Sequence, residues 1–150
     1  MKKTRLIIVD DCEMIRKVLK LLLLSIEEIE IAAEASDGQE ALDLIAKNDY
    51  DVVLMDINMP NLNGIEATKQ IKKIDKNIKI LTNSFNVSAF YVKEMLKVGA
   101  SGYITKGDTR AAYLEAIWTV HNGGVYLSEE IDASVYDEVY SDMKQARRIA

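Results

Sequence analysis

The amino-acid sequence predicts an α/β protein built on a doubly wound, five-stranded parallel sheet with an extra helix at its C-terminal end. Three observations support this prediction. Short apolar runs rich in β-branched residues recur five times along the chain. Segments with the spacing of amphipathic helices alternate with these runs. The runs are continuous rather than alternating in polarity, which is typical of strands that helices cover on both faces.

The predicted strands and helices follow one another in strict alternation. The strands are expected at Leu6–Val9, Ile29–Ala33, Val52–Met55, Ile78–Leu81 and Tyr103–Thr105. Apolar residues at helical spacing mark helices within 14–26, 41–45, 65–74, 90–98 and 113–120. Glycines follow the fourth and fifth of these helices, as they often do at a helix end.

The last part of the chain has a different pattern. Residues Ile131 to Ile149 have the pattern of an amphipathic helix. Its apolar positions are Val135, Val139, Met143 and Ala146. We therefore expect one domain over residues 1–127, followed by a helical segment over residues 128–150.

The composition of the 150 residues limits the available chemistry. A hydrophobic share of 49% and a charged share of 29% are those of a globular protein. The single Cys12 excludes an intrachain disulfide. Together with the single His121, it supplies too few ligands for a Cys/His zinc site and leaves little room for a hydrolytic triad. The net charge of −5 argues against wholesale nucleic-acid binding by this segment.

No stretch of the sequence resembles a targeting or membrane-spanning segment. The longest apolar stretch runs from Leu21 to Leu24, far short of the roughly 18 residues that suggest a membrane span. The apolar run after the basic N-terminus, Leu6–Val9, is also shorter than the roughly 7–15 residues of a signal-peptide core. We therefore expect a cytoplasmic protein without membrane contact.

Acidic residues follow two of the predicted strands. Asp10 and Asp11 end the first strand, and Asp56 ends the third. Because ligands of open parallel sheets bind beyond the carboxyl ends of the strands, we expect the three carboxylates to converge there. Such a group suits a cation that prefers oxygen ligands, and Mg²⁺ is the metal that takes few protein carboxylates. A carboxylate held there could also act as a nucleophile toward phosphorus.

Phosphoryl transfer also needs positive charge and hydrogen-bond donors around the phosphoryl oxygens. Lys106 follows the fifth strand and is placed to supply the charge. A hydroxyl at the end of the fourth strand, from Thr82 or Ser84, could donate a hydrogen bond.

These motifs resemble the receiver domain of bacterial two-component response regulators, over residues 4 to about 127. They are Ile7-Ile8-Val9-Asp10-Asp11, Leu54-Met55-Asp56-Ile57-Asn58-Met59-Pro60, Asn63-Gly64 and Gly99-Ala100-Ser101-Gly102-Tyr103-Ile104-Thr105-Lys106. The resemblance implies a flavodoxin-like (βα)5 fold. It also implies a phosphorylation-controlled switch that catalyses at most its own phosphorylation and dephosphorylation.

The resemblance assigns roles to the acidic residues. Asp56 is the implied phosphoacceptor. Asp10 and Asp11 resemble the acidic pair that binds Mg²⁺ together with Asp56, and the backbone carbonyl of Asn58 is implied as a further ligand. The phosphoryl group would come from a partner sensor histidine kinase.

The same resemblance assigns roles on the fourth and fifth strands. Lys106 is similar to the lysine that contacts the acyl phosphate, and Tyr103 to the switch aromatic. An ungapped comparison places the switch hydroxyl at Ser84, 28 residues after Asp56. Thr82 is the alternative, but it requires a shortened strand and a longer loop, so we favour Ser84.

A narrower resemblance, to the NarL/FixJ subfamily, follows from the residues after Lys106 and after the fifth helix. The chain has Lys106-Gly107-Asp108 where many receivers have Lys-Pro, and Gly123-Gly124-Val125-Tyr126-Leu127-Ser128 follows the fifth helix. Subfamily members carry a C-terminal LuxR-type helix-turn-helix domain, which this sequence lacks. Residues 128–150 would then be a linker helix toward that output domain, through which alone the protein would contact DNA. Either the sequence is cut from a longer regulator or the protein ends here; we favour the first.

Two questions of assembly and function stay open at this stage. The apolar run from Leu19 to Leu24, with Ile15, exceeds what one buried helix face needs. It fits either a homodimer formed on phosphorylation through the first and fifth helices or simple core packing. The alternatives to a transcriptional switch are a stand-alone, chemotaxis-like receiver and a Mg²⁺-dependent phosphohydrolase with an aspartyl-phosphate intermediate. The phosphohydrolase is disfavoured because Asn58 occupies the position of the usual acid.

Overall fold

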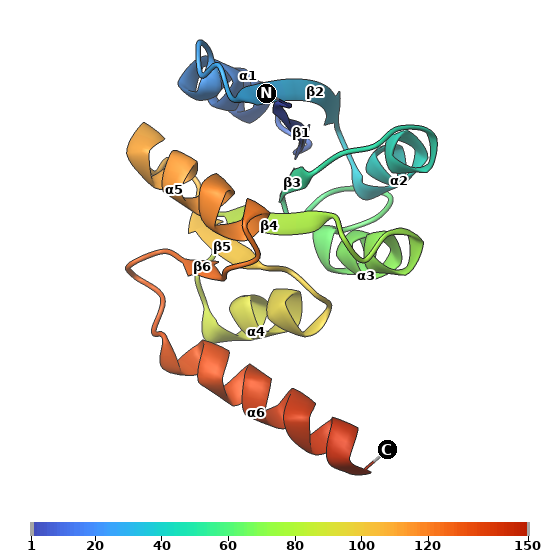
Figure 1. Ribbon diagram of the computed structural model, residues 1–150, viewed down its shortest axis with the longest axis vertical. Helices are drawn as coiled ribbons and strands as arrows, with labels where there is room; N and C mark the ends of the chain where they lie inside the picture. Colours follow the sequence, from blue (N-terminus) through green and yellow to red (C-terminus); the bar gives the residue numbers. More distant parts are fainter. Residues whose placement is uncertain (1, 150) are drawn as a thin grey trace.

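The computed structural model describes residues 2–149, with the backbone alone over residues 142–149. Within this range the chain forms six strands and six helices (Figure 1). In chain order they are β1 Thr4–Val9, α1 Glu13–Leu23, β2 Ile29–Ala35, α2 Gly38–Lys47, β3 Val52–Met55, α3 Gly64–Ile74, β4 Lys79–Ser84, α4 Ala89–Lys97, β5 Gly102–Thr105, α5 Arg110–His121, β6 Tyr126–Leu127 and α6 Ser134–Ile149.

The strands form one parallel sheet in the order β2-β1-β3-β4-β5-β6. The predicted α/β class and parallel sheet are confirmed, but the prediction of five strands is wrong, because the described chain adds β6 at the edge. Tyr126 and Leu127 pair with Gly102 and Tyr103 of β5. The Ser128 N–H extends this ladder by donating to the Tyr103 carbonyl at 3.0 Å. A strand of two residues is too short to leave a period in the sequence.

Helices cover both faces of the sheet, with α1 and α5 on one face and α2, α3 and α4 on the other. Figure 1 shows α1 and α5 on the opposite side from α2 and α3. Side chains of β1 alternate between the two layers: Leu6 and Ile8 pack toward α1 and α5, whereas Ile7 and Val9 pack toward the other helices. Both faces of the strand are therefore buried, which explains the continuous apolar runs.

Side chains that accept hydrogen bonds from the first turn fix the starts of three helices. Asp37 accepts from the Glu40 N–H at 2.8 Å at the start of α2. Asn63 does so for α3, and Thr109 for α5. Each satisfies a backbone donor that the helix itself leaves unpaired.

The strand order places the functional end of the sheet at β1 and β3. The chain adds β2 on one side of β1 and then reverses, so β3 pairs on the other side. Ligands of doubly wound sheets bind beyond the carboxyl ends of the strands at such a reversal. Val9 and Met55 are paired in register there, and the Asp56 N–H donates to the Val9 carbonyl at 2.9 Å. Asp10 and Asp56 consequently leave the sheet side by side.

Gly64 holds the start of α3 against the loop that follows β3. Its N–H donates to the Ile57 carbonyl at 2.7 Å. A Cβ atom at this position would lie 2.0 Å from the Asp56 carbonyl oxygen. The close approach that fixes the backbone of Asp56 therefore requires glycine.

The C-terminal helix packs back onto the domain. Ile131, Val135 and Val139 are buried in the cluster that contains the core side chains of α4. Lys93 of α4 also forms an ion pair with Glu138 of α6, with Nζ and Oε2 2.5 Å apart. Figure 1 shows α6 lying beside α4. The expected apolar positions Met143 and Ala146 lie outside the described side chains.

The predicted helix from Ile131 to Ile149 begins later, at Ser134. The Ile131 N–H closes a turn by donating to the Ser128 carbonyl at 2.9 Å, and Asp132 Oδ1 accepts from the Ser134 N–H at 3.0 Å where the helix begins. In the part of the chain that the structure describes, no helix is long and apolar enough to cross a membrane.

We predict that Gly64→Ala lowers the free energy of unfolding by about 3 kcal/mol, because the added methyl group overlaps the Asp56 carbonyl. The measurement is urea unfolding followed by far-ultraviolet circular dichroism. Gly107→Ala is the control, because Gly107 has a positive φ of 85° but no atom within 4 Å of the place that a Cβ atom would take. It should cost only about 1 kcal/mol. Equal losses in the two variants would contradict the steric account.

Candidate functional site

Three carboxylates meet beyond the ends of β1 and β3. Oxygen atoms of Asp10, Asp11 and Asp56 lie within 4.8 Å of one another. Asp10 and Asp56 are buried, whereas Asp11 is exposed. Among the described residues, this is the one cluster of acidic, His or Cys side chains with metal-site spacing. The structure thus brings together the three acidic residues that the sequence singled out.

Lys106 enters the same cluster from the end of β5. Its Nζ lies 2.8 Å from Asp10 Oδ2 and 3.0 Å from Asp56 Oδ1. The Lys106 side chain is only 9% exposed, so little water screens these contacts. One ammonium group faces three carboxylates, and an excess of negative charge remains.

This donor set fits a magnesium ion. Carboxylate oxygens are the ligands that Mg²⁺ prefers, and it binds proteins through one or two of them while keeping several waters. Asp10, Asp11 and Asp56 would hold the ion, and the excess negative charge favours it. When bound, the ion would neutralise charge on a phosphoryl group.

Electrostatics within the cluster shift two ionisable groups. Burial, followed by the charge of Asp10, raises the pKa of the Asp56 carboxyl to about 6, although Lys106 opposes the shift. Burial on its own would lower the pKa of Lys106. Its hydrogen bonds to Asp10 and Asp56 outweigh that effect and raise the pKa. Lys106 therefore stays charged at neutral pH, where Asp56 is mostly ionised.

The two oxygens of Asp56 have different surroundings. Oδ1 accepts hydrogen bonds from the Ile57 N–H at 2.8 Å and from Lys106. No described residue donates to Oδ2. Oδ2 is consequently the oxygen whose lone pairs are available to an incoming group.

Arg16 positions the backbone next to Asp10, a role that the sequence did not suggest. Its guanidinium donates to the Asp10 carbonyl at 2.7 Å and forms an ion pair with Glu34 at 3.2 Å. The Cys12 N–H donates to Asp10 Oδ1 at 2.9 Å. These bonds fix both the backbone and the side chain of Asp10. An arginine in a helical pattern gives no signal of this kind, because its partner lies on β2.

The two candidate hydroxyls occupy different places on β4. Ser84 is the last residue of the strand, and its carbonyl accepts from the Lys106 N–H at 3.0 Å. Thr82 lies two residues earlier, paired with Met55 and Tyr103 inside the sheet. The strand runs through to Ser84, whose backbone is hydrogen-bonded to that of Lys106. The choice of Ser84 over Thr82 as the switch hydroxyl stays a prediction.

Tyr103 connects β5 to the loop after Ser84. Its ring is buried and its hydroxyl donates to the Asn86 carbonyl. Burial raises the pKa of this hydroxyl, so it stays a donor at neutral pH. The Asn86 N–H in turn donates to Ser84 Oγ at 3.1 Å. A movement of Ser84 would therefore reach Tyr103 through one residue.

Two further features were not expected from the sequence. Tyr113 of α5 donates to Asn83 Oδ1 at 2.7 Å in the core, and burial raises the pKa of Tyr113 to about 12. The bond fastens α5 to β4 next to Ser84.

Asn58, the predicted source of a carbonyl ligand, lies exposed in the loop between β3 and α3. Its predicted role as a ligand stays a prediction.

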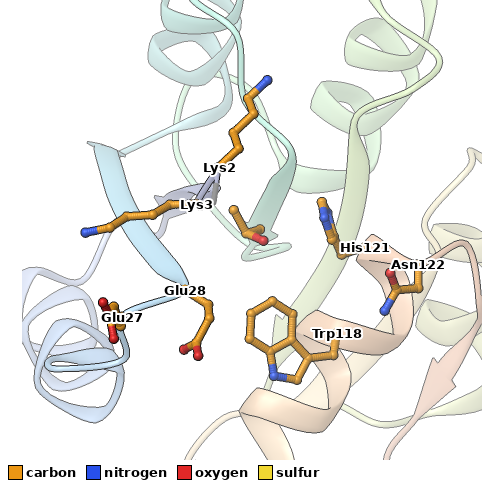
Figure 2. Close-up of a pocket in the computed structure, with 8 residues that line it drawn as sticks. Lys2, Lys3, Glu27, Glu28, Trp118, His121 and Asn122 are labelled. Carbon is orange, nitrogen blue, oxygen red and sulfur yellow. The ribbon is translucent and has the colours of Figure 1, made fainter.

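A separate hollow of about 510 Å³ lies at the opposite end of the sheet (Figure 2). It is lined by residues before β1 and β2 and by the end of α5, including Glu28, Trp118 and His121. Figure 2 shows the amino groups of Lys2 and Lys3 pointing away from Trp118. The lining mixes both charges and contains none of the clustered carboxylates, so this hollow is separate from the carboxylate cluster.

Comparison with known proteins places this chain in a family. The family described as the response regulator receiver domain matches residues 6–117. The chain therefore belongs to the response regulator receiver domain family. The predicted resemblance is confirmed.

Three proteins illustrate what this chain is similar to in sequence and structure. The transcriptional regulatory protein DegU of Brevibacillus brevis is 37% identical over 136 residues, covering 91% of this chain and 58% of DegU. A LuxR-family response regulator from Aurantimonas sp. SI85-9A1 has a TM-score of 0.84 at 30% identity, covering 91% of this chain and 98% of that one. CheY of Borrelia burgdorferi, solved as a CheX-CheY-BeF3-Mg²⁺ complex, has a TM-score of 0.75 at 31% identity, covering 79% and 90%. The chain spans about three fifths of the length of its transcriptional and response-regulator relatives.

We predict that Asp56→Asn stabilises the metal-free protein at pH 7.5 by about 2–3 kcal/mol. The pKa of Asp56 is raised from 3.8 to about 6 in the folded protein. Ionised Asp56 therefore costs stability above pH 6, and this cost disappears as the pH falls toward 4. The gain of the variant should shrink over the same range.

Urea unfolding in EDTA between pH 4 and pH 7.5 measures this effect. Asp43→Asn removes an exposed carboxylate on α2 and serves as the control, with little change expected at either pH. A constant or rising gain of Asp56→Asn toward pH 4 would contradict the burial of a charged Asp56.

Proposed function

We propose that the protein is the receiver of a transcription regulator, in which Asp56 accepts a phosphoryl group from a partner sensor histidine kinase. The observation that carries the proposal is the contact of one ammonium group, that of Lys106, with two buried carboxylates. Asp10, Asp11 and Asp56, with the backbone carbonyl of Asn58, would hold Mg²⁺. The BeF3-Mg²⁺ complex of the related CheY supports this choice of metal.

In the proposed reaction, Asp56 Oδ2 attacks the phosphorus atom of the donor. A new O–P bond forms while the bond from phosphorus to the leaving group breaks, and the leaving group takes the electron pair. Lys106 is close enough to Asp56 to contact a phosphoryl oxygen at the same place. The Ser84 hydroxyl accepts from Asn86 through its oxygen, so its hydrogen is available for the phosphoryl group.

Phosphorylation would then shift a population of conformations. The new charge draws Lys106 and Ser84 toward Asp56. Ser84 is connected to Tyr103 through Asn86. The loop that contains Asn86 leads into α4, on which α6 packs. Residues 128–150 would thus carry the change as a linker helix toward an output domain.

Several findings support a transcriptional output for the proposed switch. DegU, the relative at 37% identity, is a transcriptional regulatory protein of which this chain matches 58%. DNA would be bound only by the output domain, in agreement with the net charge of −5. The same site would equally serve a receiver that acts through protein contacts alone, the alternative expected from the sequence. A cytoplasmic location is part of the proposal.

The exposed face of α1 supports a proposed homodimer. Exposed apolar side chains form a stripe along it, namely Met14, Val18 and Leu21 of the helix and Leu24 directly after its end. Helix α1 also contacts the start of α5, where Arg110 Nε donates to the Leu22 carbonyl at 2.9 Å. Contiguous exposed apolar side chains of this kind mark interaction surfaces. We propose that a second copy covers this stripe and α5 after phosphorylation.

The phosphoacceptor is tested with acetyl phosphate and Mg²⁺. We predict that the wild-type chain and Asp43→Ala incorporate a phosphoryl group, whereas Asp56→Ala incorporates none because the nucleophile is absent. Phosphate-affinity gel electrophoresis separates the two forms. Incorporation by Asp56→Ala at the wild-type level would overturn the assignment.

The dimer is tested by placing a charge in the stripe. We predict that beryllofluoride with Mg²⁺ makes the wild-type chain dimeric, and that Leu21→Lys stays monomeric because it buries a lysine. Leu21 is 71% exposed, so the substitution should leave the fold intact. Ile74→Lys, on the exposed apolar residue of α3, is the control and should still dimerise. Sedimentation velocity measures the outcome, and a dimeric Leu21→Lys would place the interface elsewhere.

A further inference from the structure

Phe85 is an exposed aromatic residue at the edge of the carboxylate cluster. It directly follows Ser84, and its side chain is 69% exposed. Lys106 Nζ lies over its ring, 5.4 Å from the centroid. This distance is within the range of a cation–π interaction. The ring is therefore held by the same ammonium group that contacts Asp10 and Asp56.

The exposure of these neighbouring groups differs sharply. The side chains of Lys106 and Asp56 are 9% and 8% exposed, whereas Phe85, whose ring centroid lies 5.4 Å from Lys106 Nζ, is 69% exposed. The ring therefore lies at the boundary between the buried carboxylate cluster and solvent.

We propose that Phe85 screens the phosphoacceptor: its ring, anchored on Lys106, limits how fast small phosphodonors and water reach Asp56. The proposal rests on the proposed function of Asp56 and adds a selection among its donors. A protein donor can displace the ring with binding energy from its own interface. A small molecule makes too few contacts for its binding energy to displace the ring.

The proposed screen affects two reactions of the same phosphorus atom: its transfer to Asp56 and its later hydrolysis. In phosphorylation, an Asp56 oxygen forms a bond to phosphorus while acetyl phosphate loses acetate, which takes the electron pair. In hydrolysis, the oxygen of a water molecule bonds to phosphorus while the Asp56 O–P bond breaks. This regenerates the Asp56 carboxylate, and inorganic phosphate leaves with the protons of the water molecule. The proposal requires that the reactant of each step enters past Phe85.

The experiment compares two phenylalanines. Phe85→Ala removes the screen, and Phe85→Tyr keeps a ring over Lys106. Phe90→Ala is the matched control, because Phe90 is 64% exposed and packs on Tyr91 rather than on Lys106. The readouts are the second-order rate constants for acetyl phosphate and for the smaller phosphoramidate, and the rate of loss of the phosphoryl group, all at saturating Mg²⁺.

We expect Phe85→Ala to increase the rate with acetyl phosphate by about threefold or more, the range of one cation–π contact, and the rate of hydrolysis by a smaller factor because water is the smallest reactant. The increase should be larger for acetyl phosphate than for phosphoramidate, because a screen discriminates by size. Phe85→Tyr and Phe90→Ala should match the wild type. Unchanged or slower rates in Phe85→Ala, or equal increases with the two donors, would overturn the proposal.

The two proposals fail in different ways. If Asp56 is not the phosphoacceptor, Asp56→Ala still incorporates the phosphoryl group, whatever the Phe85 variants do. If Asp56 is the phosphoacceptor and Phe85 has no role, Asp56→Ala is inert and Phe85→Ala behaves as the wild type. Thermal unfolding of each variant verifies that the comparison is made between folded proteins.

Discussion

Three carboxylates, two of them buried, lie together and repel one another, so positive charge must balance them. The contacts around the site hold the groups that provide this balance. Lys106 contacts two of them, Asp10 and Asp56, yet cannot neutralise the set. The remaining negative charge favours a divalent cation, and burial holds the pKa of Asp56 near 6. A phosphoryl group that arrives with Mg²⁺ changes this balance, so Lys106 and its neighbours have a reason to rearrange. The proposed switch is a consequence of that electrostatic constraint.

The fold holds the charges at these distances through backbone contacts. The paired ends of β1 and β3 place Asp10 beside Asp56, and the close approach of Gly64 fixes the loop that follows. On the other side, Tyr113 fastens α5 to β4 through Asn83. The contacts of the β4–α4 loop lead from Ser84 through Asn86 to Tyr103. This is the loop that would move in the proposed switch, while the backbone contacts above would hold the cluster in place.

The sequence predicted those parts of the molecule that depend on local pattern. Buried strands leave continuous apolar runs, so the residues that end them, Asp10, Asp56 and Lys106, could be located from the amino-acid sequence alone. Features that depend on packing between distant segments leave no such pattern. The two-residue β6 exists because its backbone meets the edge of β5. The contact of the Phe85 ring with Lys106 joins residues from two loops. Nothing in the sequence around either residue indicates that the other lies beside it.

The central claim is that Asp56 carries the phosphoryl group. The most direct measurement treats the wild-type protein with acetyl phosphate and Mg²⁺, reduces the product with borohydride, and sequences its peptides by tandem mass spectrometry. Reduction of an aspartyl phosphate yields homoserine at the modified position. We predict homoserine at position 56 and nowhere else, with none formed when Mg²⁺ is removed. Homoserine at another position, or a modified His121, would contradict it.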